Sequence, residues 1–143
     1  MSDIKVVVWS GTGNTSAMAE AVADGIRAAG GNPTVIGFSQ ISADELAQAD
    51  KFALGCPAMG AEQLEESEVE PFFTELEGKI SGKKIALFGS YGWGSGEWMN
   101  LWADRVTGAG ATLINGEGLI AHEAPDDAAL SDCKALGEAL AKA

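Results

Sequence analysis

The sequence predicts an α/β fold: a doubly wound, five-stranded parallel sheet with helices on both faces. Short runs of β-branched and apolar residues alternate regularly with segments of helical periodicity, and the runs lack the in-and-out alternation of a half-exposed strand. The connections between them are short, which favours a parallel sheet covered by crossover helices. A length of 143 residues suits one hydrophobic core, so we expect a single domain over residues 1–143.

Five apolar runs are the expected strands, and the helices between them have recognisable ends. Gly30 and Gly31 follow the first helical segment, and Ser42 with Glu45 three residues later is a capping box at the start of the second. The expected strands are residues 4–9, 34–36, 51–56, 84–90, and 112–114 together with 119–120; the other helices are expected to begin at 14, to span 69–76 and 98–106, and to run from 125 to the end.

Acidic residues dominate the charge of the chain. Twenty-one Asp and Glu oppose nine Lys and Arg, which gives a formal net charge of −12. This argues against nucleic acid as a partner, because nucleic-acid binding depends on Lys and Arg at the phosphates. It favours electropositive protein partners, or serves solubility alone.

Other features of the whole chain exclude several classes of protein. No apolar stretch approaches the roughly 20 residues that span a bilayer, and no signal peptide is visible, so we expect a cytoplasmic protein without a membrane partner. Cys56 and Cys133 have no metal-type spacing and form no CxxC pair, so we expect both to be reduced, partly buried and chemically quiet. His122 is the only histidine, and it cannot build a histidine metal site by itself.

The loop after the first strand carries the strongest signal, since ligands of doubly wound sheets bind beyond the carboxyl ends of the strands. Glycines in this loop let the backbone turn and approach a ligand, and the following helix N-terminus attracts an anion. The loop lacks the Lys of a Walker A motif, and Ser16 stands where a dinucleotide fingerprint needs a third glycine. A terminal phosphate monoester is the remaining ligand, and an ordinary Gly-rich turn is the alternative. The loop consists of Ser10, Gly11, Thr12, Gly13, Asn14 and Thr15.

The loop after the third strand contains a candidate four-residue turn, Met59-Gly60-Ala61-Glu62. Gly60 at its first central position permits the positive φ of a type II′ turn. Such a turn can flip its central peptide, and it could therefore change conformation in response to protonation of the ligand. The alternative interpretation, that these residues form an ordinary surface loop, fits them equally well.

The loop after the fourth strand places a tryptophan between glycines. Gly92 and Gly94 leave the Trp93 ring free to lie against a planar ligand, a contact that adds about 0.5–1.5 kcal/mol beyond area burial. Trp98 and Trp102, four residues apart on the next helix, are expected to pack that helix against the core. Trp9 and His122, at other strand ends, are more readily explained as a core residue and an exposed residue than as ligand contacts.

Taken together, the three loops resemble those of the flavodoxin family, in particular its short-chain, clostridial-type members. Residues 10–15 match the family's phosphate loop, 58–60 with Glu62 its inner flavin loop, and 90–94 its outer flavin loop, and the likeness continues through residues 64–68 and 71–72. The resemblance implies the strand order 2-1-3-4-5 and one non-covalent FMN. The fifth strand has no space for the insertion of long-chain flavodoxins.

The resemblance also implies a role for each candidate residue. Met59 and Trp93 would sandwich the isoalloxazine, and the Gly60 carbonyl would turn to accept a hydrogen bond from the flavin N5–H. Glu62 would hold the pyrimidine N3–H, and the Gly92 amide would approach N1 and O2. Ser10, Gly11, Thr12, Gly13, Asn14 and Thr15 would bind the phosphate, and Ala58, Ala61, Ser90, Tyr91 and Gly94 would complete the two flavin loops.

The implied function is low-potential, one-electron transport by a monomer that is not an enzyme. The flavin would cycle between neutral semiquinone and anionic hydroquinone, and electropositive flavodoxin or ferredoxin reductases and ferredoxin-using oxidoreductases would be the partners. Acidic residues near the flavin edge would steer these partners. The candidates are Glu62, Glu65, Glu66 and Glu68, whose alternative role is that of a solvated acidic stretch.

Two other functions fit the same fold. An FMN-dependent NAD(P)H quinone reductase needs a substrate pocket over the flavin, whereas Met59 and Trp93 would cover both of its faces. A phosphoacceptor receiver domain needs acidic residues after the first and third strands, where this chain has Ser10-Gly11 and Pro57-Ala58.

Overall fold

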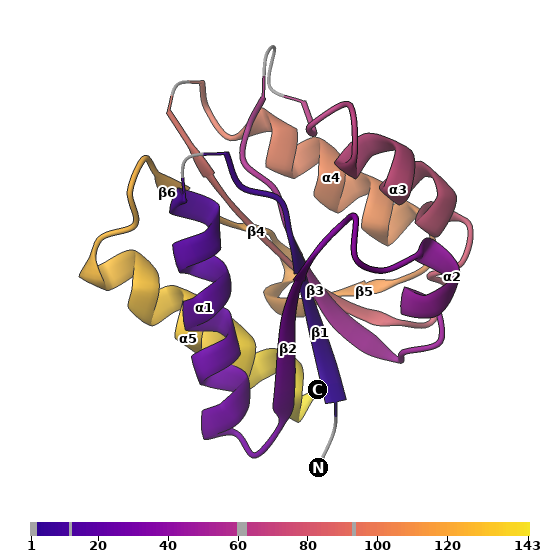
Figure 1. Ribbon diagram of the computed structural model, residues 1–143, viewed down its shortest axis with the longest axis horizontal. Helices are drawn as coiled ribbons and strands as arrows, with labels where there is room; N and C mark the ends of the chain where they lie inside the picture. Colours follow the sequence, from indigo (N-terminus) through magenta and orange to yellow (C-terminus); the bar gives the residue numbers. More distant parts are fainter. Residues whose placement is uncertain (1–2, 12, 60–62, 93) are drawn as a thin grey trace.

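The computed structural model describes residues 3–11, 13–59, 63–92 and 94–143, which form a sheet between two layers of helices (Figure 1). The elements are β1 (Asp3–Val8), α1 (Asn14–Ala28), β2 (Asn32–Gly37), α2 (Ala43–Leu46), β3 (Lys51–Gly55), α3 (Val69–Glu77), β4 (Lys84–Tyr91), α4 (Glu97–Gly108), β5 (Thr112–Leu113), the 3-10 helix η1 (Ile114–Gly116), β6 (Leu119–His122) and α5 (Asp127–Lys142).

The described strands form one parallel sheet in the order β2-β1-β3-β4-β5, which confirms the predicted fold. Its register aligns the carboxyl ends of the central strands. Val8 at the end of β1 pairs with Gly55 at the end of β3, and Gly55 in turn pairs with Phe88 of β4. The loops that follow β1, β3 and β4 therefore leave the sheet at one edge, the upper edge in Figure 1.

The fifth strand differs from the prediction because it is interrupted. β5 and β6 both pair with β4, and η1 separates them, so the described sheet has six strands. Asn115 and Gly116 inside η1 have φ values of 64° and 77°. These left-handed conformations, which Asn and Gly tolerate best, end an extended strand.

Two hydrophobic cores lie on opposite faces of the sheet. Helices α1 and α5 cover one face, and α2, α3 and α4 cover the other (Figure 1). Trp98 and Trp102 of α4 are each 1% exposed and pack in the second core with Phe73, as their spacing predicted. Cys56 and Cys133 are free, as expected, and both are buried, which raises the pKa of each thiol to about 12.

Two glycines bring α1 and α5 into backbone contact. A Cβ at Gly137 would overlap the Val22 carbonyl oxygen of α1, and a Cβ at Gly25 would overlap the Lys134 carbonyl oxygen of α5. The two helices therefore approach each other at a separation that only glycine allows. This contact fixes α1, whose N-terminus carries the first candidate loop.

We predict that Gly137→Ala destabilises the protein by about 1–3 kcal/mol, because the methyl group must push α5 away from α1. Urea unfolding followed by far-UV circular dichroism measures the change. Gly108→Ala is the control, since a Cβ at this residue of α4 meets no atom within 4 Å. We expect that variant to be neutral or more stable by less than about 1 kcal/mol. Equal stability of the two variants would contradict the close contact.

Candidate cofactor site

The three candidate loops meet around a pocket of about 270 Å³ at the carboxyl edge of the sheet. The predicted residues that line it are Gly11, Asn14, Ala58, Met59, Ser90, Tyr91 and Gly92, and the structure adds Trp9, Pro57 and Glu123. Ser10, Gly13, Thr15 and Gly94 are described but do not line it. Thr12, Gly60, Ala61, Glu62 and Trp93 lie outside the described residues.

Ser90 connects the three loops. Its N–H donates to the Thr15 hydroxyl at the start of α1 over 3.3 Å, and the two hydroxyl oxygens lie 3.1 Å apart. Its carbonyl accepts the N–H of Ala58, after β3, over 3.0 Å. Thr15 and Ser90 are 1% and 4% exposed, so water does not compete for these bonds. One residue of β4 thus fixes the relative positions of the loops after β1 and β3.

The first loop is shaped for an anion. Ser10 Oγ accepts the N–H groups of Gly13 and Ser16, at 3.1 and 3.3 Å, and so closes the loop from within. Gly13 precedes α1 with a φ of 92°, a conformation that favours glycine. The first turn of α1 contains no acidic residue. The N–H groups of that turn have no acceptor within the helix, and the helix dipole favours a negative charge there, so the loop fits a phosphate group.

The second loop is anchored on both sides of residues 60–62. Met59 and Gln63 exchange two backbone hydrogen bonds, each of 3.0 Å, in an antiparallel bridge. This bridge brings Met59 and Gln63 side by side. Gly60, Ala61 and Glu62 between them lie outside the described residues, so the turn stays a prediction. Pro57, which has no backbone N–H to offer a ligand, also lines the pocket.

The third loop presents backbone to the pocket. A Cβ at Gly92 would meet no atom within 4 Å, so no protein group close to this position requires the glycine. The absence of a side chain there leaves space for a ligand to approach the Gly92 amide. Tyr91 fixes the start of the loop, since its ring packs on Trp98 at 5.9 Å between centroids.

Trp9 both packs against the core and lines the pocket, whereas the sequence favoured only the packing role. It packs partly buried against the second core, as predicted, and it also lines the pocket. Its Nε1–H donates to Glu68 Oε2 over 2.9 Å, which joins the end of β1 to the segment before α3. The structure also adds Glu123, which has a φ of 56°. No sequence signal marks a glutamate for a left-handed conformation, so this residue was missed.

Glu65 is buried, with 6% of its surface exposed, and it caps the chain segment before α3. Its carboxylate accepts the N–H groups of Ser67, Glu68 and Val69 over 3.0, 2.7 and 3.2 Å, together with the Ser67 hydroxyl. Its own N–H points to Cys56 Sγ at 3.5 Å. Burial raises the pKa of the Glu65 carboxyl, but these hydrogen bonds outweigh burial and hold that pKa below its usual range. Glu65 is thus a structural residue of the second loop.

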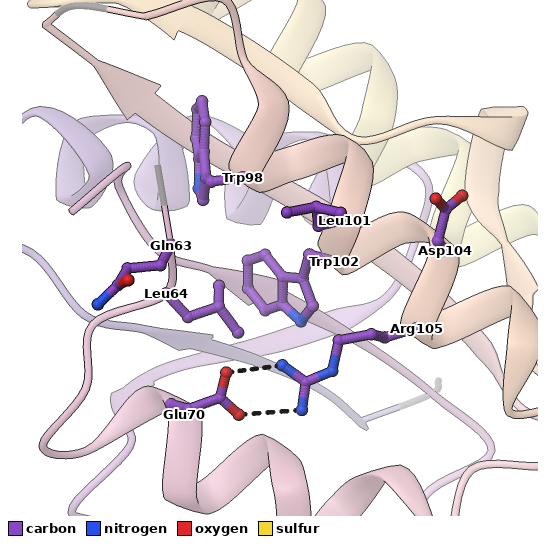
Figure 2. Close-up of a pocket in the computed structure, with 8 residues that line it drawn as sticks. All are labelled: Gln63, Leu64, Glu70, Trp98, Leu101, Trp102, Asp104 and Arg105. Atoms are coloured by element: carbon purple, nitrogen blue, oxygen red, sulfur yellow. Dashed lines mark hydrogen bonds and ion pairs between the residues drawn. The ribbon is translucent and has the colours of Figure 1, made fainter. Parts of the chain in front are cut away.

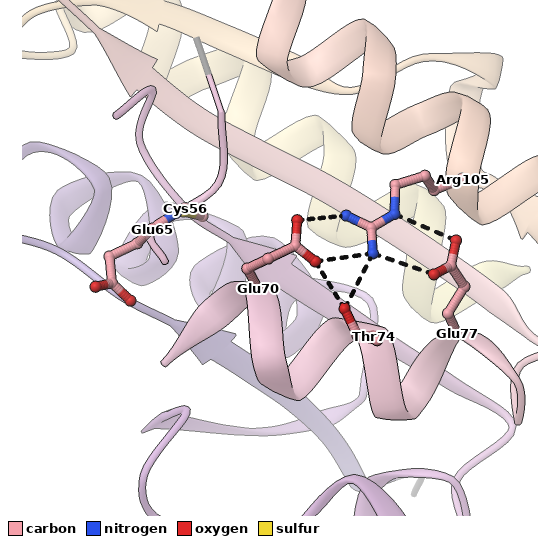
Figure 3. A network of polar contacts seen from close by, with 6 residues as sticks. All are labelled: Cys56, Glu65, Glu70, Thr74, Glu77 and Arg105. Carbon is pink, nitrogen blue, oxygen red and sulfur yellow. Dashed lines mark hydrogen bonds and ion pairs between the residues drawn. The ribbon is translucent and has the colours of Figure 1, made fainter. Parts of the chain in front are cut away.

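Arg105 joins α4 to α3 beneath this loop. Its guanidinium bonds Glu70 through two nitrogens at 2.8 and 2.9 Å and also bonds Glu77, as Figure 3 shows, with Glu65 apart from this network beside Cys56. The hydrogen bond from Arg105 holds the pKa of Glu70 below its usual range. The guanidinium carbon also lies 4.8 Å from the centre of the Phe73 ring.

A larger pocket, of about 430 Å³, lies between α3, α4 and the chain segment at Gln63 and Leu64. Figure 2 shows Trp98, Leu101 and Trp102 facing Leu64, with the Glu70–Arg105 pair at one end. Leu101 is 52% exposed. None of the predicted candidate residues lines this pocket, and it does not touch the phosphate-type loop after β1.

The described part of the chain contains neither a metal cluster nor a membrane-spanning helix. Among residues 3–11, 13–59, 63–92 and 94–143, no group of three His, Cys, Asp or Glu side chains is placed to hold a metal ion. Over the same residues, no helix combines the length and the apolar character that crossing a membrane requires.

We predict that Glu65→Gln destabilises the protein at pH 7 by about 1–2 kcal/mol, because it removes the charge from the four hydrogen bonds. The pKa of Glu65 is lower in the folded state, so its contribution is present above the unfolded value near 4.3 and is lost as the pH falls through the folded value. Urea unfolding at pH 7 and at decreasing pH measures both effects.

The matched control for this prediction is Glu66→Gln, which removes the same charge from an exposed neighbour. We expect that variant to unfold like the unmodified protein at pH 7. An equal loss in both variants, or a Glu65→Gln effect that does not shrink in acid, would contradict the role of Glu65 as a buried cap.

Comparison with known proteins agrees with this geometry. The family model described as flavodoxin matches residues 6–137. The chain is 52% identical over 140 residues to the flavodoxin of Megasphaera elsdenii, covering 98% of this chain and 99% of that protein. It is 49% identical over 138 residues to the flavodoxin of Clostridium beijerinckii, covering 96% and 99%.

The solved structures agree as well. The solution structure of two-electron reduced Megasphaera elsdenii flavodoxin matches with a TM-score of 0.86 at 50% identity, covering 98% of this chain and 99% of that one. Family model, relatives and fold therefore lead to one conclusion. The chain belongs to the flavodoxin family, the FMN-binding proteins that carry electrons between redox partners and are not enzymes.

Proposed function

We propose that this chain is a low-potential, one-electron carrier whose FMN cycles between neutral semiquinone and anionic hydroquinone. The observation that carries the proposal is the convergence of three loops on one pocket, held together by Ser90. The flavin supplies the redox chemistry, and the protein orients it and tunes its potential. We further propose that residues 1–143 act as a single, monomeric, cytoplasmic domain.

We assign the phosphate to the N-terminus of α1, with residues 10–15 around it. The absence of acidic residues in the first turn of α1 and the internal closure of the loop by Ser10 support this assignment. We assign the isoalloxazine to the space between the second and third loops, with Met59 and Trp93 on its two faces. The open position at Gly92 supports the approach of its amide to N1 and O2.

The Met59–Gln63 bridge supports a turn at residues 60–62 that responds to the flavin. In this proposal the Gly60 carbonyl turns to accept the hydrogen bond from N5–H, and Glu62 accepts the one from N3–H. Ala58, the residue before Met59, is held to Ser90 and anchors the start of the segment.

Acidic residues around the pocket would oppose the negative charge that the second electron places on the flavin ring. A carboxylate about 10 Å from the flavin, at an effective dielectric of about 20–40, costs the anion about 1–1.5 kcal/mol, or about 40–65 mV for one electron. Glu123 lines the pocket, and 67% of its side chain is exposed. Glu66 and Glu68 are also exposed, and they follow the second loop closely in the sequence. Glu65 belongs to the cap and not to this exposed rim.

We expect stepwise anaerobic reduction of the FMN-loaded protein to pass through the long-wavelength absorption of a blue neutral semiquinone. Gly60→Ala should lower the semiquinone yield, because a Cβ hinders the turn. Gly78→Ala, at a position with open space and ordinary φ, is the control and should leave the yield unchanged. Direct two-electron bleaching of the unmodified protein would contradict the carrier mechanism and favour a quinone reductase.

We propose that electropositive reductases and ferredoxin-using oxidoreductases dock at the exposed flavin edge, steered by the acidic rim. The pair Glu66→Gln and Glu123→Gln should slow reduction by a flavodoxin reductase and flatten its dependence on ionic strength. Stopped-flow kinetics between about 10 and 300 mM salt measures both, since screening grows over that range. The control pair, Asp24→Asn and Glu45→Gln, removes equal charge far from the pocket. Equal effects of the two pairs would contradict local steering.

A further inference from the structure

The end of β6 holds two consecutive peptide groups of the third loop. Tyr91 and His122 form the last residue pair between β4 and β6. Beyond this pair, the N–H of Glu123 donates to the Tyr91 carbonyl over 2.7 Å. His122 Nε2 then lies 3.2 Å from the Gly92 carbonyl oxygen. The first bond fixes the peptide that carries the Gly92 N–H, and the second fixes the peptide that follows it.

The position of the imidazole proton follows from these neighbours. A carbonyl oxygen only accepts hydrogen bonds, so Nε2 must carry a proton to bond Gly92. Glu123 Oε1, another acceptor, lies 3.8 Å from the same nitrogen and favours the same tautomer. The ring also meets Tyr91 edge-on, with 5.1 Å between centroids. His122 is therefore held in place by packing while its N–H reaches the loop.

The backbone of Gly92 needs a contact from another part of the chain, such as the hydrogen bond from His122, to hold it in place. This residue carries no side chain, and a Cβ built there would meet no described atom within 4 Å, so no side-chain packing at this position holds it. Two residues later, Gly94 adopts a φ of 90°, which only glycine adopts readily. A glycine-rich loop loses much conformational entropy when a ligand orders it, and a bond formed before binding reduces that cost.

We propose that His122 is a positioning residue of the cofactor site. Its Nε2–H holds the Gly92 carbonyl while the Glu123 N–H holds the Tyr91 carbonyl, so that the peptides on both sides of Gly92 are fixed and its amide N–H is presented to the flavin pyrimidine. The inference rests on the proposed placement of FMN. Gly92 has no side chain of its own to replace the bond, and it lines the pocket together with Tyr91. His122 itself stays outside the pocket, with 58% of its side chain exposed.

Two variants separate the hydrogen bond from the ring contact. His122→Phe keeps an aromatic ring against Tyr91 but has no donor, whereas His122→Gln has no ring but places an amide donor at the position of Nε2. We expect the phenylalanine variant to bind FMN about 3- to 10-fold more weakly, the loss of one hydrogen bond, and the glutamine variant to bind within about twofold of the unmodified protein. Quenching of FMN fluorescence on titration with apo-protein measures the dissociation constants.

Urea unfolding of the apo-proteins and potentiometric titration of the loaded ones complete the test. We expect the unfolding midpoints of all three proteins to coincide and the midpoint potentials of the phenylalanine variant alone to shift. Unchanged FMN affinity in His122→Phe, or equal losses in both variants, would overturn the inference. Failure of the unmodified protein to bind FMN would instead overturn the proposed function, so the two failures are distinguishable.

Discussion

The buried hydrogen bonds of Ser90 are the constraint on which the candidate site depends. Thr15 belongs to α1, Ala58 follows β3, and Ser90 ends the buried part of β4, yet all three are joined through one residue. Parallel strands bring their carboxyl ends to one edge but leave the loops free to move independently. The Ser90 bonds remove that freedom, because breaking any of them leaves a buried polar group without a partner.

The position of Ser90 depends in turn on close packing between β3 and β4. A Cβ at Gly89 would overlap the Cys56 carbonyl oxygen, so the strands approach here only because residue 89 is glycine. The same carbonyl accepts the Trp98 Nε1–H over 3.1 Å, which ties α4 to the end of β3. Arg105 of α4 forms ion pairs with Glu70 and Glu77 of α3, which tie these two helices together. The helices on that face therefore support the second loop as a connected layer.

The sequence was sufficient for the parts of the structure that depend on local patterns. Apolar runs located the strands, and the predicted cap at Ser42 is present, with its Oγ accepting the Glu45 N–H over 3.0 Å. It was insufficient where tertiary contacts override a pattern. The acidic run at 65–68 indicated an exposed surface, but Glu65 is buried because three backbone N–H groups converge on it. Trp9 fits the apolar pattern of a core residue, but its indole N–H also donates a hydrogen bond to Glu68, in a different segment of the chain.

The interruption of the fifth strand has a consequence for self-association. An outer strand presents a row of unpaired backbone groups, which another chain can extend by pairing in the same way. Here that row is divided: β5 offers only Thr112 and Leu113, and the left-handed Asn115 and Gly116 turn the chain before β6 begins. A second chain would find two separate templates, of two and four residues, each shorter than the most common strand length of about five or six. The break at η1 thus makes this side of the sheet a poor template for edge-to-edge aggregation.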